Sequence, residues 1–146
     1  MKTLPLITCD VVSGPVQPIG LDSEVSGGAA VVFLGRTRED SHAIHGSLQY
    51  LEYEAQIDMA VDTMRDLAVE AANRWDLAIV RIQHGTGRID LGQPSVCIEV
   101  LSNHSIEAFE AAHWLIRTLK VRVPIWKCEV WAHGKTWATG EVIETP

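Results

Sequence analysis

The spacing of apolar residues along the chain predicts two long amphipathic helices. In the first, apolar side chains recur at alternating intervals of four and three residues, the period of one helix face: Ile57, Val61, Met64, Ala68, Ala71 and Trp75. The second helix is expected over residues 105–120, and Pro124 stops its continuation. One stripe of this helix contains Ile106, Phe109, His113, Ile116 and Lys120, with Ala112, Leu115 and Leu119 beside it.

Short apolar segments bounded by Gly, Pro and polar residues predict the strands. They lie at residues 29–35, 47–54, 77–84 and 95–101, and a hairpin of 125–131 and 136–142 is expected to turn around His133, Gly134 and Lys135. Gly and Pro in GTGRIDLGQP, residues 85–94, indicate turns. Residues 36–46 form a polar, exposed loop, either functional and mobile or partly disordered.

The N-terminal segment MKTLPLITCDVV is interpreted as a first strand rather than a signal peptide. Pro5 and Asp10 interrupt its apolar run, and no small-residue cleavage site follows. No apolar run in the chain approaches the roughly 20 residues that a membrane span requires. We therefore expect a cytoplasmic protein that does not associate with membranes.

The order of the elements after this segment, β-β-α-β-β-α-β-β, indicates the fold class. Strands adjacent in sequence favour an α+β fold, an antiparallel or mixed sheet with two main helices packed on one face, over a doubly wound parallel sheet. The 146 residues suffice for one domain with its own core, so residues 1–146 are expected to form a single domain.

Composition and charge exclude several classes of function. A formal net charge of −7 argues against a nucleic-acid binder, which would normally be basic. Cys9, Cys97 and Cys128 are odd in number and far apart, without metal-ligand spacing, so neither a disulfide framework nor a zinc site is indicated. Any anion site must be built locally by a few cations.

Cations gather most densely in LKVRVPIWK, residues 119–127, around a helix end, a proline turn and a strand start. Lys120 and Arg122 are explained either by the preference for cations at helix C-termini or by an anion site. Lys127 lies between Trp126 and Cys128 in an apolar strand, where its ammonium group must either extend to solvent or face an anion.

Two weaker candidates lie elsewhere in the chain. His104 and Ser105 begin the second helix, where free backbone N–H groups and an imidazole suit a phosphate or carboxylate, although a plain helix cap explains them equally well. Arg36 and Arg38 follow a buried strand, where a rigid scaffold presents loop side chains, but solvated surface arginines are the alternative. By themselves these clusters suggest a small anionic ligand.

Three motifs sharpen this interpretation. FxGxxR occupies residues 33–38, LEYEA residues 51–55 and LKxxxPxWK residues 119–127, with NRW and LSNH between the last two. In this order and spacing the chain resembles the large, catalytic subunit of molybdopterin synthase, the MoaE family, over about residues 28–137.

The resemblance implies a hammerhead-like α+β fold and a homodimer of large subunits within a heterotetramer. A small ubiquitin-like sulfur-carrier subunit would bind at each outer end and insert its C-terminal Gly-Gly thiocarboxylate into a pocket. The implied reaction transfers sulfur to cyclic pyranopterin monophosphate, and two transfers form the dithiolene of molybdopterin. The family needs no metal or organic cofactor for this step.

The resemblance also assigns roles to residues at matching positions. Lys120 and Lys127 would be the catalytic lysines, with Lys120 the essential group and Lys127 the stabiliser of substrate and intermediate. Arg38, His104 and Arg122 would line the pocket for the precursor's phosphate and the carrier's terminus. Phe33 and Pro124 would shape its walls.

Two positions depart from the family pattern. The family commonly has arginine where this chain has Ser105 and Gly85, and both differences remove positive charge near the substrate. Arg36, where relatives often have a small residue, could compensate. The alternatives to an active synthase are a weakened paralogue that acts as a dimeric carrier-binding module, and an anion-binding protein without a carrier; retention of Lys120 and Lys127 favours the enzyme.

Overall fold

The structure, a computed structural model, describes residues 4–138 and confirms the predicted order of strands and helices, with one additional short strand at Ser41–His42. The elements are β1 (Leu6–Ser13), β2 (Ala29–Arg36), β3 (Ser41–His42), β4 (Gly46–Ala55), α1 (Ile57–Trp75), β5 (Ile79–Asp90), β6 (Pro94–Ser102), α2 (Ser105–Arg122), β7 (Ile125–Trp131) and β8 (Gly134–Trp137).

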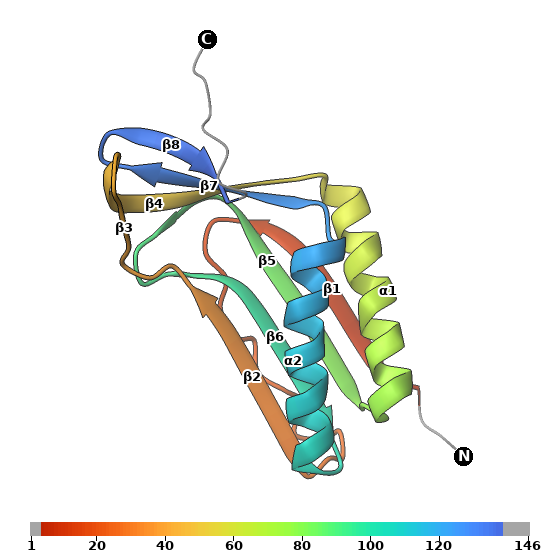
Figure 1. Cartoon of the computed structure of the whole chain (residues 1–146). Helices are drawn as coiled ribbons and strands as arrows, with labels where there is room; N and C mark the ends of the chain where they lie inside the picture. Colours follow the sequence, from red (N-terminus) through yellow and green to blue (C-terminus); the bar gives the residue numbers. More distant parts are fainter. Residues whose placement is uncertain (1–3, 139–146) are drawn as a thin grey trace.

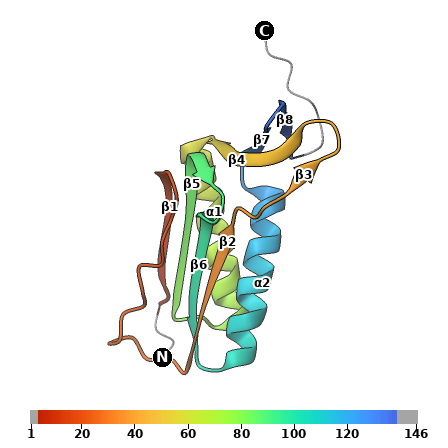
Figure 2. The same cartoon turned by 90° about the vertical axis from the view of Figure 1, so that its left-hand side faces the viewer.

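The strands form one mixed sheet in the order β2-β6-β5-β4-β7-β8, with β1 beside β5 and β3 beside β4. Every pairing is antiparallel except that of β1 with β5. The sheet has two parts, which Figures 1 and 2 show from two sides. We call β1, β2, β6 and residues 79–86 of β5 the shaft, and β3, β4, β7, β8 and residues 87–90 of β5 the head.

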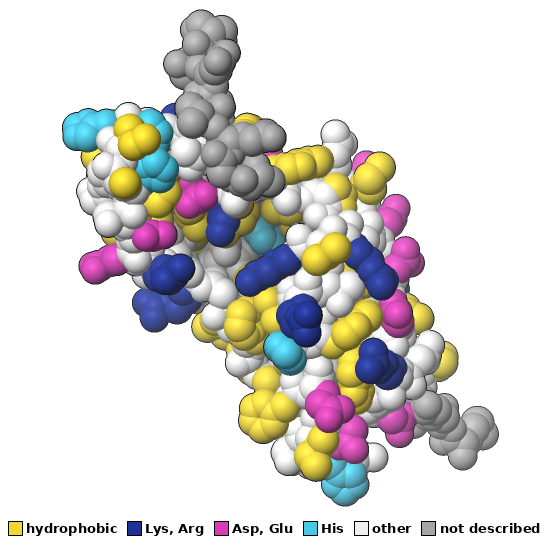
Figure 3. Space-filling view, viewed as in Figure 1, with side chains coloured by type: hydrophobic (Ala, Val, Ile, Leu, Met, Phe, Trp, Pro, Cys, Tyr) yellow, Lys and Arg dark blue, Asp and Glu magenta, His cyan; other side chains and the backbone are white. Residues whose placement is uncertain are grey.

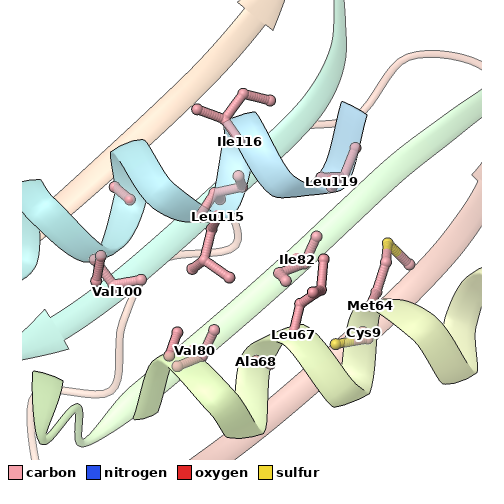
Figure 4. Packing of buried hydrophobic residues seen from close by; sticks show 14 of the residues in the cluster. Cys9, Met64, Leu67, Ala68, Val80, Ile82, Val100, Leu115, Ile116 and Leu119 are labelled. Atoms are coloured by element: carbon pink, nitrogen blue, oxygen red, sulfur yellow. The ribbon is translucent and has the colours of Figure 1, made fainter. Parts of the chain in front are cut away.

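Both helices pack on the same face of the shaft, as predicted. The strand register aligns Cys9 with Ile82, Ile82 with Ile98 and Ile98 with Phe33, so these side chains share one face. Against them α1 places Met64, Leu67, Ala68 and their neighbours, and α2 places Leu115, Ile116 and Leu119 (Figure 4). This layer between helices and sheet is the main hydrophobic core.

The stripe predicted for α2 is not its buried face. Of its five members only Ile116 is buried, whereas Ile106 and Phe109 are 67% and 65% exposed. The buried face consists instead of Ala108, Ala111, Ala112, Leu115, Ile116 and Leu119. Alanines let the helix backbone approach the sheet and α1 closely, so the larger side chains point outward.

The turn predicted over residues 85–94 is also mostly wrong. Strand β5 continues through Gly85 to Asp90, and only residues 91–93 turn. Its last four residues leave the shaft and pair with Tyr50, Leu51, Glu52 and Tyr53 of β4. Gly87, with φ of 75°, supplies a backbone conformation that other residues rarely adopt, so the strand can bend from one part of the sheet into the other.

The C-terminal hairpin turns one or two residues earlier than predicted. Ala132 and His133 form the turn, whereas Gly134 and Lys135 already belong to β8. A Cβ at Gly134 would lie 2.5 Å from the ring of His45, so the strand passes too close to this ring for a side chain. Residues 139–142 of the predicted second strand lie outside the described residues.

The loop over residues 36–46 is more ordered than predicted. Its Ser41 and His42 form β3 against β4, and the rings of His42 and His45 stack 4.6 Å apart. Most of the loop is exposed, but Thr37 is buried. Among residues 4–138, neither helix is long and apolar enough to span a membrane.

Residues 14–28 cover part of the shaft face that points away from the helices. The fully buried carboxylate of Glu99 accepts hydrogen bonds from the backbone N–H of Gly20 at 2.9 Å and of Ile19 at 3.4 Å, and it lies 3.4 Å from Arg81 Nη1. Gln83 Nε2 donates to the carbonyl of Gln17. A buried charge needs such partners, and here they attach the segment to the sheet.

Two methionines of α1 test the assignment of the hydrophobic core, because they differ in burial. Met64 is fully buried, whereas Met59 is 61% exposed. Met64→Ala should lower the free energy of unfolding by about 2–5 kcal/mol because it leaves a cavity. Met59→Ala should change it by less than about 0.5 kcal/mol. Urea denaturation measures both, and equal losses would contradict this assignment of the core.

Candidate functional site

The two predicted site lysines lie where the head meets the shaft. Lys120 is exposed in the last turn of α2, and Lys127 is half-buried on β7, opposite Tyr53 of β4. Pro124, half-buried, leads from the helix into the strand, and its carbonyl accepts a hydrogen bond from Gln56 N–H at 3.2 Å. The proline therefore redirects the chain so that both lysines border the same junction.

The cations at this junction are largely unpaired. Within residues 4–138, Lys120, Lys127 and Arg38 form no ion pair, although the chain carries 19 acidic residues. Arg122 lies 3.2 Å from a carboxylate oxygen of Glu70, an exposed pair of the kind that contributes little to stability. Figure 3 shows Lys and Arg side chains gathered over the C-terminal half of α2 and the junction. This surface suits an anion.

Strand β2 contributes the second set of predicted residues. Phe33 is half-buried and packs against the core on the helix side, and Arg38 is exposed two residues beyond the strand. Arg36 donates from Nε to the carbonyl of Gly92 at 2.9 Å. Arg36 and Arg38, with Thr37 between them, line a pocket of about 390 Å³ at this end of the shaft.

His104 and Ser105 lie at the other end of the shaft. Both are exposed at the start of α2, where His104 is the N-cap residue and makes no side-chain capping bond. At 1.5 Å per residue, Ser105 and Lys120 are separated by about 22 Å along the helix. A single chain therefore does not bring His104 to the lysines. Arg36 pairs with Pro94, at the opposite end of β6 from Ser102, so it does not lie near Ser105 either.

Three residues that the sequence analysis did not single out form a cluster around Tyr53, which lies opposite Lys127. Ser95 Oγ donates a hydrogen bond to the Tyr53 hydroxyl at 3.1 Å, and the ring of His84 meets the Tyr53 ring edge-on at 4.9 Å. Tyr53 belongs to the LEYEA motif, but its neighbours come from strands distant in sequence. Only the strand register reveals the cluster.

The His84 imidazole is held in its neutral form. Burial lowers the pKa of His84, and a hydrogen bond from Nδ1 to the carbonyl of Gly85 at 2.7 Å partly opposes this effect. Because a carbonyl only accepts, Nδ1 carries the proton. Burial likewise raises the pKa of Tyr53, so its hydroxyl stays protonated at neutral pH.

The cysteines do not supply a nucleophile. Cys9, Cys97 and Cys128 are free and buried. Burial raises the thiol pKa of Cys9 and Cys97 to about 11, so the reactive thiolate form is scarce at neutral pH. In the described part of the chain, no group of three or more His, Cys, Asp or Glu side chains could hold a metal ion.

Comparison with known families decides which kind of protein carries this junction. The model of the family described as MoaE protein matches residues 15–122. The chain belongs to the MoaE family. The match includes Lys120 and Arg122 but ends before Lys127.

Curated members of the MoaE family are similar over most of the chain. The molybdopterin synthase catalytic subunit of Pyrococcus abyssi is 34% identical over 86% of this chain and 83% of its own length. That of Bacillus subtilis is 37% identical over 81% of this chain and 73% of its own length. The similarity thus extends well beyond the motifs at the junction.

Solved structures agree with the fold. The crystal structure of molybdopterin synthase from Staphylococcus aureus aligns with a TM-score of 0.79 at 32% identity, covering 88% of this chain and 94% of that chain. A complex of subunits 1 and 2 of the molybdopterin-converting factor from Helicobacter pylori aligns with a TM-score of 0.68 at 18% identity, over 89% of each chain. The second likeness supports the fold alone.

The two positions that depart from the MoaE pattern differ in their surroundings. Ser105 is exposed at the first position of α2, with room for a longer side chain. Gly85 is buried, and a Cβ there would lie 2.1 Å from the carbonyl oxygen of Gly14. In this chain the backbone of Gly14 therefore occupies the space that an arginine at residue 85 would need.

Restoring each arginine should therefore have opposite consequences for stability. Ser105→Arg should change the free energy of unfolding by less than about 0.5 kcal/mol because the position is exposed. Gly85→Arg should destabilise by about 3 kcal/mol or more, because backbone must move to admit the side chain. Thermal unfolding monitored by circular dichroism compares the stabilities of the two variants. A Gly85→Arg protein as stable as the native one would contradict the tight packing at Gly14.

Proposed function

We propose that this chain is the catalytic subunit of a cytoplasmic molybdopterin synthase, transferring sulfur from a thiocarboxylated carrier protein to cyclic pyranopterin monophosphate. The observation that carries the proposal is the pair Lys120 and Lys127, unpaired within residues 4–138 and bordering one junction in a member of the MoaE family. Its relatives from Pyrococcus abyssi and Bacillus subtilis are molybdopterin synthase catalytic subunits.

The charges at the junction suit this reaction. The donor thiocarboxylate, the cyclic phosphate of the precursor and the carboxylate left on the carrier are all anions. Cations held in place before the reaction stabilise such charge without reorganisation, and Lys120, Lys127 and Arg38 are available for this. Lys120 is proposed as the essential acid or base and Lys127 as the stabiliser of substrate and intermediate, with Phe33 and Pro124 shaping the walls of the pocket.

The carrier is proposed to be a small ubiquitin-like protein with a C-terminal Gly-Gly. The Helicobacter pylori chain with the same fold comes from a complex of subunits 1 and 2 of a molybdopterin-converting factor, the kind of assembly that is proposed here. A thin, flexible terminus can reach a partly buried side chain more easily than a folded surface can, and Lys127 is half-buried. We therefore place the carrier's terminus next to Lys127.

We also propose that each site uses two copies of the chain. His104 caps the start of α2, and Lys120 lies in its last turn, about 22 Å from the first helical residue Ser105. His104 and Lys120 can therefore contact one substrate only if they come from different copies. Ile106 and Phe109, beside His104, are 67% and 65% exposed. A homodimer that covers these apolar side chains would bring His104 and Ser105 of one copy to the lysines of the other.

The alternative is a weakened paralogue that binds a carrier but turns over slowly. The observation in its favour is Ser105, which removes a cation from the start of α2. The loss of a hydrogen bond to a charged group costs about 1.5–3 kcal/mol, or roughly tenfold to a hundredfold in affinity. This alternative predicts carrier binding without efficient turnover.

The lysines provide the first test of the proposal. Purified protein, thiocarboxylated carrier and cyclic pyranopterin monophosphate are mixed, and molybdopterin formation is measured. Lys120→Ala should lower kcat at least about a hundredfold if it acts as acid or base, and Lys127→Ala about tenfold or more through lost charge stabilisation.

Lys135→Ala is the matched control, because Lys135 lies on β8 of the head and contacts Glu52 at 3.9 Å. It should leave turnover unchanged. Turnover in Lys120→Ala equal to the native rate would refute the assigned role. A native protein that binds carrier without turnover would favour the weakened paralogue.

Mixed dimers test whether two copies share a site. Lys120→Ala and His104→Ala homodimers should each be impaired. The two variants are mixed in equal amounts, denatured and refolded. Half of the resulting two-fold dimers then contain one copy of each variant, and each mixed dimer has one intact site of two, so about a quarter of native activity should return. No recovery above the two separate variants, with mixed dimers demonstrated by tags, would contradict a shared site.

A further inference from the structure

The cations of the proposed site belong to two different parts of the sheet. Lys127 lies on β7 in the head, whereas Lys120 lies in the last turn of α2, which packs on the shaft, and Arg38 follows the shaft strand β2. The distance between Lys127 and the other two therefore depends on how the head sits on the shaft. Strand β5 joins the two parts through Gly85 and Gly87, where the backbone bends with φ of 75° at Gly87. Glycines restrain this bend weakly.

Tyr53 crosses the junction. It belongs to β4 in the head, directly opposite Lys127, and packs there against Leu51 and its neighbours. Its hydroxyl accepts the hydrogen bond from Ser95 Oγ at 3.1 Å, and its ring contacts His84 at 4.9 Å. Ser95 and His84 are buried residues of the shaft, on β6 and β5. One side chain thus contacts both parts of the sheet.

Other links also cross the junction, and one of them is a side-chain contact: Ile125 of β7 packs against the main hydrophobic core. Two of the segments that connect head and shaft are also joined to each other, because Gln56 N–H bonds to the carbonyl of Pro124. Within residues 4–138, the Ser95–Tyr53 bond is the side-chain hydrogen bond that joins head to shaft. A buried hydroxyl that loses its partner destabilises its position, so this bond resists rotation of the head.

We propose that Tyr53 is a positioning residue that sets the head at a fixed angle to the shaft and thereby holds Lys127 at the substrate bound by Lys120 and Arg38. The assignment of these cations rests on the proposed function, whereas the mechanical role of Tyr53 does not.

The activity test removes only the hydroxyl. Tyr53→Phe keeps the ring against His84 but loses the bond to Ser95, so kcat should fall roughly tenfold, since misplacing a reacting group by about 1 Å can cost up to a hundredfold. KM for the precursor should change little. Tyr50→Phe is the matched control: Tyr50 lies on the same strand, faces the opposite side and stacks under Arg88 at 4.0 Å. It should keep native kcat.

A distance measurement tests the mechanical role without activity. Nitroxide labels on Ala132→Cys in the head and Asn73→Cys in the shaft layer, both exposed positions, report the angle between the parts by pulsed electron spin resonance. The three native thiols are buried and label poorly. The distance distribution should broaden in Tyr53→Phe and stay native in Tyr50→Phe.

Ser95→Ala removes the same bond from the other partner and protects the test against a folding defect in Tyr53→Phe. Each single variant and the double variant should show the same broadening and the same loss of kcat, because the bond can be lost only once. A native distance distribution in both single variants would overturn the proposal, even if kcat fell. Broadening together with an inactive native protein would keep the positioning role and reject the proposed function.

Discussion

Strand β5 pairs with strands in both parts of the sheet, and the rest of the structure depends on how it passes from one part to the other. Its first eight residues pair with β1 and β6 under the helices, and its last four pair with β4. A strand with side chains throughout would favour a continuous twist; Gly85 and Gly87 permit a bend and the close approach of Gly14. The bend creates the junction at which α2, β2 and β7 present their cations, and it also makes that junction dependent on side-chain contacts such as Tyr53 with Ser95.

The electrostatics of the molecule give the junction its chemical character. A chain with a net charge of −7 repels small anions on average, so binding one requires cations that acidic neighbours do not neutralise. Arg122 is paired with Glu70, whereas Lys120 and Lys127 are not paired within the described residues. The half-buried position of Lys127 among apolar neighbours strengthens its interaction with a bound anion, because less water screens the charge.

The difference between the predicted and observed faces of α2 has a functional consequence. Periodicity alone placed Ile106 and Phe109 on an apolar stripe, and the structure places both in solvent beside His104. Alanines at 108, 111 and 112 take the buried face, since close packing of a helix on a sheet favours small side chains. The exposed pair supports a second copy of the chain as part of the site. The membership of the MoaE family, by contrast, was already indicated by motifs in the sequence.

The sequence by itself determined the order of the strands and helices, the position of α1, and the identity of the clustered cations, because periodicity and motif spacing are local properties of the chain. Only the tertiary structure decided which face of α2 is buried and how far His104 and Lys120 lie apart within one copy. It also showed that β5 continues through a glycine-rich segment whose composition predicts a turn. It also decided that Tyr53 contacts Ser95 and His84. These features depend on strand register and on packing between residues distant in sequence, which no local pattern encodes.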